Sequence, residues 1–203
     1  MQMSVADRIN SFARRVPVWV VYVVYLSAVP WLLYLAQTGG LGREPIKALE
    51  HELGEIALQL LIIGLAITPL RQHLSVNLLK FRRAIGLLAF IYVTLHLLVW
   101  LILDVGIVSQ IWADILKRPY ITIGMIAFVL MVPLAATSNN LSVRKLGRTW
   151  RSLHKLVYVV AILGAVHHIM VKKVWEIEPL VYLAVILILV ALRFRGVRRK
   201  RLA

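Results

Sequence analysis

The chain of 203 residues contains no cysteine. Disulfide bonds, iron–sulfur clusters bound by thiolates, and haem attached covalently through a C-x-x-C-H motif are therefore excluded. A cofactor held non-covalently by histidine is not excluded, because the chain has six histidines. The sequence also lacks a G-x-G-x-x-G fingerprint and a P-loop, so it offers no recognisable nucleotide-binding motif.

Acidic residues are scarce, whereas hydrophobic residues are abundant. The chain has 9 Asp and Glu against 24 Lys and Arg, and 61% of its residues are hydrophobic. Soluble domains have about 45–50% apolar residues, so this excess indicates a membrane protein. Strongly basic chains are often nucleic-acid-binding proteins. Here the positive charge lies in short clusters between apolar segments, as membrane topology requires, and we expect no nucleic-acid partner.

Six segments are apolar enough to cross a membrane, for which a helix needs about 20 residues. They cover residues 16–36, 53–70, 84–103, 120–137, 153–171 and 179–194. The first is too long for a cleavable signal peptide. We therefore predict an all-α membrane protein, with a single domain over residues 1–203 that forms a bundle of six transmembrane helices in membrane lipid.

The connections between the predicted spans are short, and we expect no appended soluble domain. Two short helices are predicted in the loops on one side, at about 46–52 and 109–116. The Gly-rich segment GGLGREP (39–45) is predicted to form a turn.

Positive charges are distributed unevenly between the two sides of the predicted bundle. The side that holds the N-terminus has 18 lysines and arginines, and the other side has 6. Because positively charged loops stay in the cytoplasm, both termini are predicted to be cytoplasmic. The positively charged segments fall on the same side after every second span and at the C-terminus. An odd number of spans would break this pattern, so the charge distribution also favours six spans.

His96 and His167 are the strongest candidates for cofactor ligands. Both lie inside predicted spans, where ionisable residues are costly and usually functional. His96 lies 12 residues after Ala84 and His167 lies 13 residues after His154, which places both about 18–20 Å from the same side of the bundle. Two neutral imidazoles at equal depth on different helices are what bis-histidine ligation of a b-type haem requires. The alternative is that each histidine only forms a hydrogen bond between helices.

The geometry of a regular helix complicates the assignment on the fifth span. At about 100° per residue, His167 points about 140° away from His154, whereas His168 lies within about 40° of it. A regular helix thus favours His168 as the residue stacked above His154. His167 would need a kink or a π-bulge near Gly164.

Four stretches of the sequence carry a resemblance to a known family. They are GGLGREPIKALEHELGE (39–55), LLKFRRAIGLLAFIYVTLH (78–96), RPYITIG (118–124) and KLGRTWRSLHKLVYVVAILGAVHH (145–168). The run LG-x-x-W-x-x-LH-x-x-VY is the most specific. These stretches resemble the MsrQ family, also called YedZ, which is the haem-binding membrane subunit of a bacterial system that repairs methionine sulfoxide in periplasmic proteins. MsrQ belongs to a wider ferric reductase-like transmembrane group.

The resemblance implies six helices and b-type haem, with haem ligands on the third and fifth spans. His96 matches the ligand on the third span. His154 and His167 match the two histidines on the fifth, at the 13-residue spacing usual in the wider group. We therefore favour His167 over His168, which remains the second choice.

The sequence departs from the two-haem pattern of the wider group at one place. That group has a second histidine on the third span, 13 or 14 residues before the outer one, where this chain has Arg83 and Arg82. An arginine stays protonated and does not bind iron. One haem between His96 and His167 is expected, and a second haem on His154 would lack its usual partner.

The arginines on this side of the predicted bundle have two interpretations. Arg82, Arg83 and Arg151 are either ordinary positive-inside anchors or ligands for haem propionates or a flavin phosphate, which arginine binds in a bidentate manner. For any single arginine, the anchoring role is favoured.

The resemblance also implies a function, namely electron transfer in the bacterial inner membrane. Electrons would come from the quinone pool or from a cytoplasmic flavin reductase, and an FMN would be part of the assembly. They would pass through haem to a periplasmic molybdenum-dependent methionine sulfoxide reductase, a separate protein. Two alternatives stay open: a stand-alone ferric or quinone reductase, and a non-redox transporter or scaffold. No internal repeat of the kind found in transporters is evident.

Overall fold

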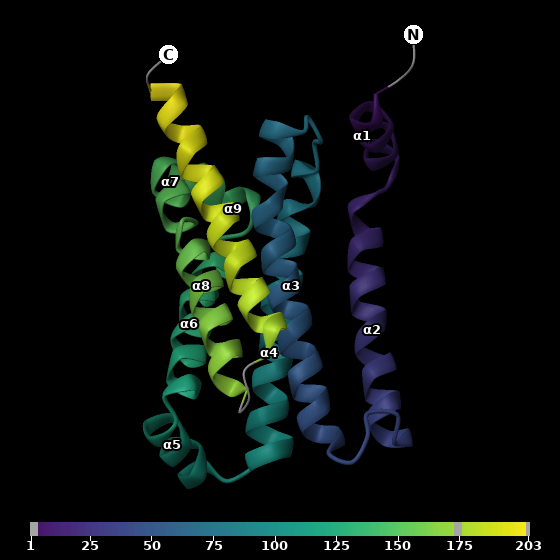
Figure 1. Cartoon of the computed structure of the whole chain (residues 1–203), viewed down its shortest axis with the longest axis vertical. Coiled ribbons are helices and arrows are strands. Elements are labelled where there is room, and N and C mark those ends of the chain that lie inside the picture. Colours follow the sequence, from purple (N-terminus) through teal and green to yellow (C-terminus); the bar gives the residue numbers. More distant parts are fainter. Residues whose placement is uncertain (1–3, 173–175, 202–203) are drawn as a thin grey trace.

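The structure is a computed structural model that describes the backbone of residues 4–172 and 176–201 and the side chains as far as residue 193. Every element of the described residues is helical (Figure 1). The helices are α1 (Val5–Arg15), α2 (Val18–Thr38), α3 (Pro45–His73), α4 (Arg82–Leu98), α5 (Val108–Lys117), α6 (Pro119–Ala136), α7 (Asn140–Leu153), α8 (Leu156–Val171) and α9 (Ile177–Arg201). A short 3-10 helix, η1 (Leu79–Phe81), precedes α4, and a π-helical segment, η2 (Val99–Val105), follows it.

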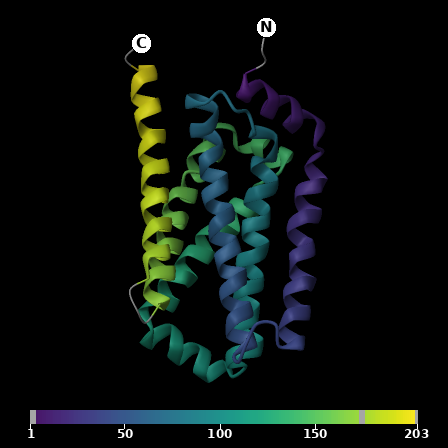
Figure 2. The same cartoon turned by 45° about the vertical axis from the view of Figure 1, so that its right-hand side comes forward.

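The long helices run side by side along one axis, and their connections gather at two ends (Figures 1 and 2). One end holds α1, the connection between α3 and α4, α7 and the C-terminal part of α9; we call it the basic end. The other holds the turn between α2 and α3, α5 and the start of α9; we call it the acidic end. Eight of the nine acidic residues lie toward the acidic end, namely Glu44, Glu50, Glu52, Glu55, Asp104, Asp114, Glu176 and Glu178.

The all-α prediction is confirmed, and several of the predicted spans can be recognised. Four helical segments are long and apolar enough to cross a membrane: α2, α3, α4 together with its flanking segments, and α6. The bent pair α7 and α8 makes a fifth if it is counted as one span. The sixth predicted span, 179–194, lies in α9, whose side chains are described only as far as Arg193. The count of six therefore remains a prediction.

The turn and one of the two predicted loop helices are confirmed. Gly39 and Gly42 have φ angles of 82° and 85°, which glycine adopts without the steric cost that a Cβ would add. The helix predicted at 109–116 is α5. The separate helix predicted at 46–52 is wrong, because these residues form the first turns of α3. Pro45 opens α3, where its fixed φ favours helix formation, and no break separates this start from the apolar run.

Two packed helix pairs form the centre of the bundle. α3 packs most extensively against α4, and α6 against α8, while α9 covers α3 and α8. α2 lies at the periphery and contributes Leu32 alone to the buried residues. Its side chains Trp19 and Trp31 are 63% and 58% exposed. Large exposed apolar side chains are expected on a helix that faces lipid.

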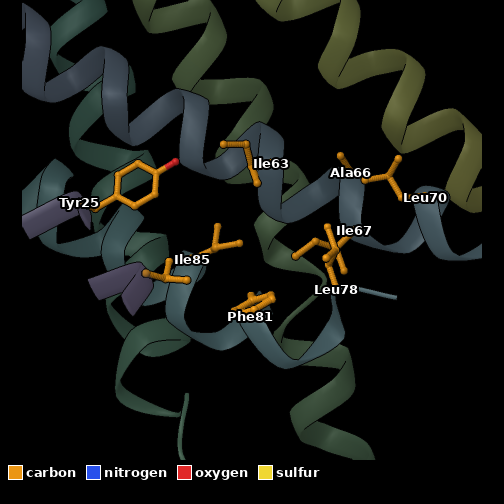
Figure 3. A pocket seen from close by; sticks show the side chains of 9 residues that line it. Tyr25, Ile63, Ala66, Ile67, Leu70, Leu78, Phe81 and Ile85 are labelled. Atoms are coloured by element: carbon orange, nitrogen blue, oxygen red, sulfur yellow. The ribbon is translucent and has the colours of Figure 1, made fainter. Parts of the chain in front are cut away.

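An apolar pocket of about 350 Å³ lies between α2, α3 and the start of α4 (Figure 3). Its lining residues are Val21, Tyr25, Ile63, Ala66, Ile67, Leu70, Leu78, Phe81 and Ile85. Among these residues, Tyr25 alone has a polar side-chain group. The pocket therefore suits hydrocarbon rather than a charged ligand.

One side-chain hydrogen bond connects the peripheral helix α2 to the core. Tyr92 of α4 is completely buried, and its hydroxyl donates to the backbone carbonyl of Tyr25. We predict that Tyr92→Phe destabilises the detergent-solubilised protein by about 0.5–1.5 kcal/mol, because the carbonyl loses its hydroxyl partner. Thermal unfolding measures the loss. Tyr34→Phe on α2 is the control, since its side chain is 56% exposed; equal losses in both variants would contradict the role of this bond.

Candidate functional site

The structure brings the two predicted ligands, His96 of α4 and His167 of α8, into contact in an edge-to-face arrangement. Their ring centroids are 6.2 Å apart and their planes are inclined at 80°. The Nδ1 atom of His96 is 2.8 Å from the carbonyl oxygen of Glu50, and that of His167 is 2.7 Å from the carbonyl oxygen of Tyr120. A carbonyl only accepts hydrogen bonds, so each Nδ1 carries the proton and each Nε2 is left with a free lone pair.

This pair of imidazoles fits the axial ligation of a haem iron. Two metal–imidazole bonds of about 2.0–2.1 Å in line, plus the radius of each ring, separate the ring centroids by about 6 Å. Within the described ranges, no group of three or more His, Cys, Asp or Glu side chains is arranged to hold a metal ion. A metal bound between the two rings would therefore take its remaining ligands from a macrocycle such as a porphyrin.

A glycine beside each ring allows this close approach. A Cβ atom on Gly54 would lie 3.0 Å from Nδ1 of His96, and one on Gly124 would lie 2.9 Å from Nδ1 of His167. The contact at Gly54 would be tighter than nine in ten real Cβ contacts, and the contact at Gly124 is one that real Cβ atoms essentially never make. Any larger residue at either position would push the ring away from the helix that holds it.

The two halves of the site have the same design. Glu50 and Gly54 lie four residues apart on α3, and Tyr120 and Gly124 lie four residues apart on α6. In an α-helix the carbonyl of residue i accepts from the N–H of residue i+4, so each glycine shares its carbonyl acceptor with the histidine. We call Glu50, Gly54 and His96 the first half-site, and Tyr120, Gly124 and His167 the second half-site.

His154 lies away from both half-sites, where α7 ends. Its Nε2 is 3.0 Å from the hydroxyl of Thr137, and its ring stacks on Trp150 at 4.0 Å. The Trp150 indole in turn donates to the carbonyl of Thr137 at 2.9 Å. Within the described residues, no second histidine ring contacts His154. These contacts tie His154 to the end of α6.

The bend on the fifth predicted span lies elsewhere than expected. α7 and α8 are inclined at 48° to each other, and the break falls at His154 and Lys155. The kink or π-bulge near Gly164 that His167 would need in a regular-helix argument is not found, because α8 runs without interruption from Leu156 to Val171. The argument that favoured His168 assumed one regular helix from His154 onward, and this bend removes that assumption.

His168 is directed toward α9 rather than toward His96. Its ring lies 5.9 Å from the ring of Tyr182, and its buried Nε2 has no hydrogen-bond partner among the described residues. The Tyr182 hydroxyl donates to Glu178 at 3.0 Å and accepts from Gln59 at 3.0 Å. Gln59 also donates to Glu55, the residue after Gly54, at 2.9 Å. This polar cluster joins α9 to α3 beside the first half-site.

Comparison with known proteins identifies the family. The model of the ferric reductase-like transmembrane component family matches residues 53–165. A relative from Agrobacterium fabrum is 48% identical over 177 residues, which cover 87% of this chain and 82% of the relative. One from Brucella anthropi is 49% identical over 170 residues, which cover 83% and 77% respectively. Both are named protein-methionine-sulfoxide reductase heme-binding subunit MsrQ.

The chain belongs to the MsrQ family. The resemblance noted in the sequence is thereby confirmed, and the chain is a membrane protein of the ferric reductase-like transmembrane group. The region matched by the ferric reductase-like family contains Gly54 and His96 of the first half-site, begins three residues after Glu50, and ends two residues before His167. No solved structure matches this MsrQ-family chain.

The carbonyl and glycine partners of the histidines were not predicted from the sequence. A backbone carbonyl has no sequence signature, since every residue carries one. The glycines do offer a signal: glycine is unfavourable inside a helix by about 1 kcal/mol relative to alanine. In membrane spans, small residues also mark close contacts between helices.

We predict that replacing either half-site glycine with alanine lowers the stability of the protein, whereas alanine normally stabilises a helix relative to glycine. Gly54→Ala and Gly124→Ala should destabilise the protein by about 1–3 kcal/mol through overpacking against the imidazoles. The effect at Gly124 should be larger, because its closest contacts are shorter. Thermal unfolding in detergent measures both.

Gly64→Ala is the matched control on α3. A Cβ there would meet Ile85 at 3.6 Å, an ordinary contact, so helix propensity should leave stability unchanged or raise it by up to about 1 kcal/mol. Losses of equal size at Gly54, Gly124 and Gly64 would contradict a steric role specific to the half-sites.

Proposed function

We propose that the chain binds one b-type haem between His96 and His167 and serves as the electron-transferring membrane subunit of a methionine sulfoxide reductase system. The observation that carries this proposal is the pair of neighbouring imidazoles from α4 and α8, each held through Nδ1 by a helix carbonyl. The relatives from Agrobacterium fabrum and Brucella anthropi are named heme-binding subunits, which supports it. A bound haem supplies a one-electron carrier within the bilayer.

Each residue of the two half-sites has its own role in holding the haem. The Nε2 atoms of His96 and His167 would hold the haem iron. The carbonyls of Glu50 and Tyr120 fix the ring orientations and make the imidazoles better donors, as partners of ligating histidines generally do. Gly54 and Gly124 leave room for the rings. His154 is not a ligand in this proposal, because Thr137 and Trp150 already hold its ring.

The proposed topology has six spans in the bacterial inner membrane, with residues 1–203 as one domain and both termini in the cytoplasm. The separation of charge between the two ends of the bundle supports this orientation, because positively charged segments stay in the cytoplasm. The acidic end then faces the periplasm. Both half-sites include residues from the parts of α3 and α6 that begin at the acidic end, which suits delivery of electrons to that side.

In this proposal, electrons enter from the quinone pool or from a cytoplasmic flavin reductase, with FMN in the assembly. They leave to a periplasmic molybdenum-dependent methionine sulfoxide reductase, which carries out the sulfoxide chemistry. The names of the relatives favour this partner over a stand-alone ferric or quinone reductase. A transporter or scaffold would purify without colour, so the presence of haem separates that class from the redox classes.

The haem proposal makes a spectroscopic prediction. The protein purified in detergent should show sharp b-type bands in the dithionite-reduced minus oxidised spectrum, with about one haem per chain. His96→Ala and His167→Ala should each lose most of the bound haem, because one axial ligand is removed. His154→Ala, His168→Ala and the exposed control His73→Ala should retain it.

Three results would change the proposal. A colourless wild-type protein, folded and produced in cells supplied with haem, would rule out the electron-transfer function. Two haems per chain, with one lost in His154→Ala, would assign His154 as a second ligand. Loss of haem in His168→Ala but not in His167→Ala would assign His168, rather than His167, as the haem ligand.

The topology proposal predicts where reporter domains are active. A fluorescent protein fused to the C-terminus should fluoresce in the cytoplasm, and alkaline phosphatase inserted into the turn at 39–44 should be active in the periplasm. Five spans would place the C-terminus outside the cytoplasm, so phosphatase activity at the C-terminus would contradict the six-span arrangement.

A further inference from the structure

Helix α1 has three faces with different surroundings. Asn10 and Ala13 face the bundle, and Ala13 is buried. Val5, Ile9 and Phe12 lie within about 60° of one another around the helix, and they are 74%, 41% and 70% exposed. The third face carries the charged side chains of the helix. We call Val5, Ile9 and Phe12 the apolar face of α1; the described residues leave it largely uncovered.

Contacts with the rest of the chain hold α1 in this orientation. The Asn10 side chain donates to the carbonyl of Ser75 at 2.9 Å and accepts from the N–H of Asn77 at 2.7 Å. Lys80 donates to the carbonyl of Val16, the residue after α1, at 2.7 Å. These bonds join α1 to the connection between α3 and α4. The apolar face is therefore presented in a fixed direction by the fold.

Positive charge borders the apolar face. Arg8 and Arg15 lie about 40–60° from Phe12 around the helix, and both are exposed, as is Arg14. In the described part of the chain, none of these three arginines forms an ion pair. Asp7, the acidic residue of α1, is engaged in the capping box at the start of the helix. The charge of this helix therefore favours an anionic partner from outside the chain.

The apolar face of α1 lies next to the part of α2 that faces lipid. α1 is inclined to α2 and runs across the basic end, with Pro17 between the two helices (Figure 2). Trp19, in the first turn of α2, is 63% exposed. Tryptophan is enriched where a membrane meets water. The start of α2 thus fits that boundary, and α1 extends from it.

We propose that α1 is an interfacial helix that binds anionic phospholipids at the basic end. The apolar face enters the acyl-chain region, and Arg8, Arg14 and Arg15 bind lipid phosphates, which suit the fork of a guanidinium. Helices with one apolar face and a basic polar face lie in the plane of a membrane in this way. A second copy of the chain is the competing occupant, and it would bring the same positive charges into the contact.

This site is independent of the proposed haem function, because no residue of α1 belongs to either half-site. It also does not depend on which end of the bundle is cytoplasmic when the protein is studied in nanodiscs, whose two faces are both open to the solvent. The chain has no cysteine, so a single introduced thiol reports on one position of α1.

The first experiment compares Phe12→Cys on the apolar face with Ser11→Cys, its neighbour toward the charged face. In nanodiscs of phosphatidylcholine and phosphatidylglycerol, a membrane-impermeant maleimide should modify Phe12→Cys at least tenfold more slowly than Ser11→Cys, because lipid covers the first thiol. After unfolding in SDS the two rates should be equal. A nitroxide attached to Phe12→Cys should be relaxed more strongly by oxygen, which dissolves in lipid, than by a water-soluble nickel complex.

The second experiment tests the arginines in the Phe12→Cys background. Arg8→Gln combined with Arg15→Gln should raise the modification rate about fivefold or more, because each arginine near an anionic surface strengthens membrane binding. The rate should then match that of the unaltered arginines in phosphatidylcholine alone. Arg144→Gln combined with Arg148→Gln, at exposed positions of α7, removes the same charge from the same end and should leave the rate unchanged. Since all four arginines are exposed, each double variant should elute from gel filtration as wild type does.

Three results would overturn the proposal. Equal modification of Phe12→Cys and Ser11→Cys in nanodiscs would show that water covers the apolar face. Shielding of the nitroxide from both oxygen and nickel would assign the face to a contact with a second copy, which is the only other protein present. Equal effects of the two arginine pairs, or equal rates with and without phosphatidylglycerol, would show that α1 does not recognise anionic lipid.

Discussion

Two hydrogen bonds, from Nδ1 of His96 to the carbonyl of Glu50 and from Nδ1 of His167 to the carbonyl of Tyr120, determine the geometry of the candidate site. Each bond selects one tautomer, and that choice leaves Nε2 as the nitrogen with a free lone pair. Each also requires the imidazole to lie against the backbone of a neighbouring helix. Only a residue without a side chain permits that contact, so the positions of Gly54 and Gly124 follow from the same two bonds.

The same constraint explains which helices pack together. Each half-site takes its carbonyl and glycine from one helix and its histidine from another, and these helix pairs, α3 with α4 and α6 with α8, are the most extensively packed in the bundle. The sequence separation between carbonyl and histidine is 46 residues in the first half-site and 47 in the second. The bundle thus contains the same structural unit twice. The sequence does not reveal this repeat, because the unit requires only one glycine and one histidine, and its third member acts through a backbone carbonyl.

The sequence predicted the helical class and the histidine pair because both depend on regular quantities. Apolar run length follows from bilayer thickness, and the equal depth of His96 and His167 follows from the fixed rise of a helix. The predictions that failed depended on contacts that a single chain segment does not encode. The bend at His154 and Lys155 accompanies contacts with Thr137 and Trp150, and no regular-helix argument contains them. Glu50 was missed as a partner because it acts through its backbone.

The chain satisfies its cations at the basic end in two different ways. Lys80 donates to the backbone carbonyls of Arg14 and Val16, at 3.1 and 2.7 Å, so its ammonium group is satisfied without any anion. A compact ammonium with three donors can use scattered carbonyls in this way. The guanidinium of Arg193 instead lies over the ring of Tyr158, with its central carbon 5.2 Å from the ring centroid. A flat, delocalised guanidinium can use the face of an aromatic ring in this way, so arginine and lysine at the same end of the bundle are held by different kinds of partner.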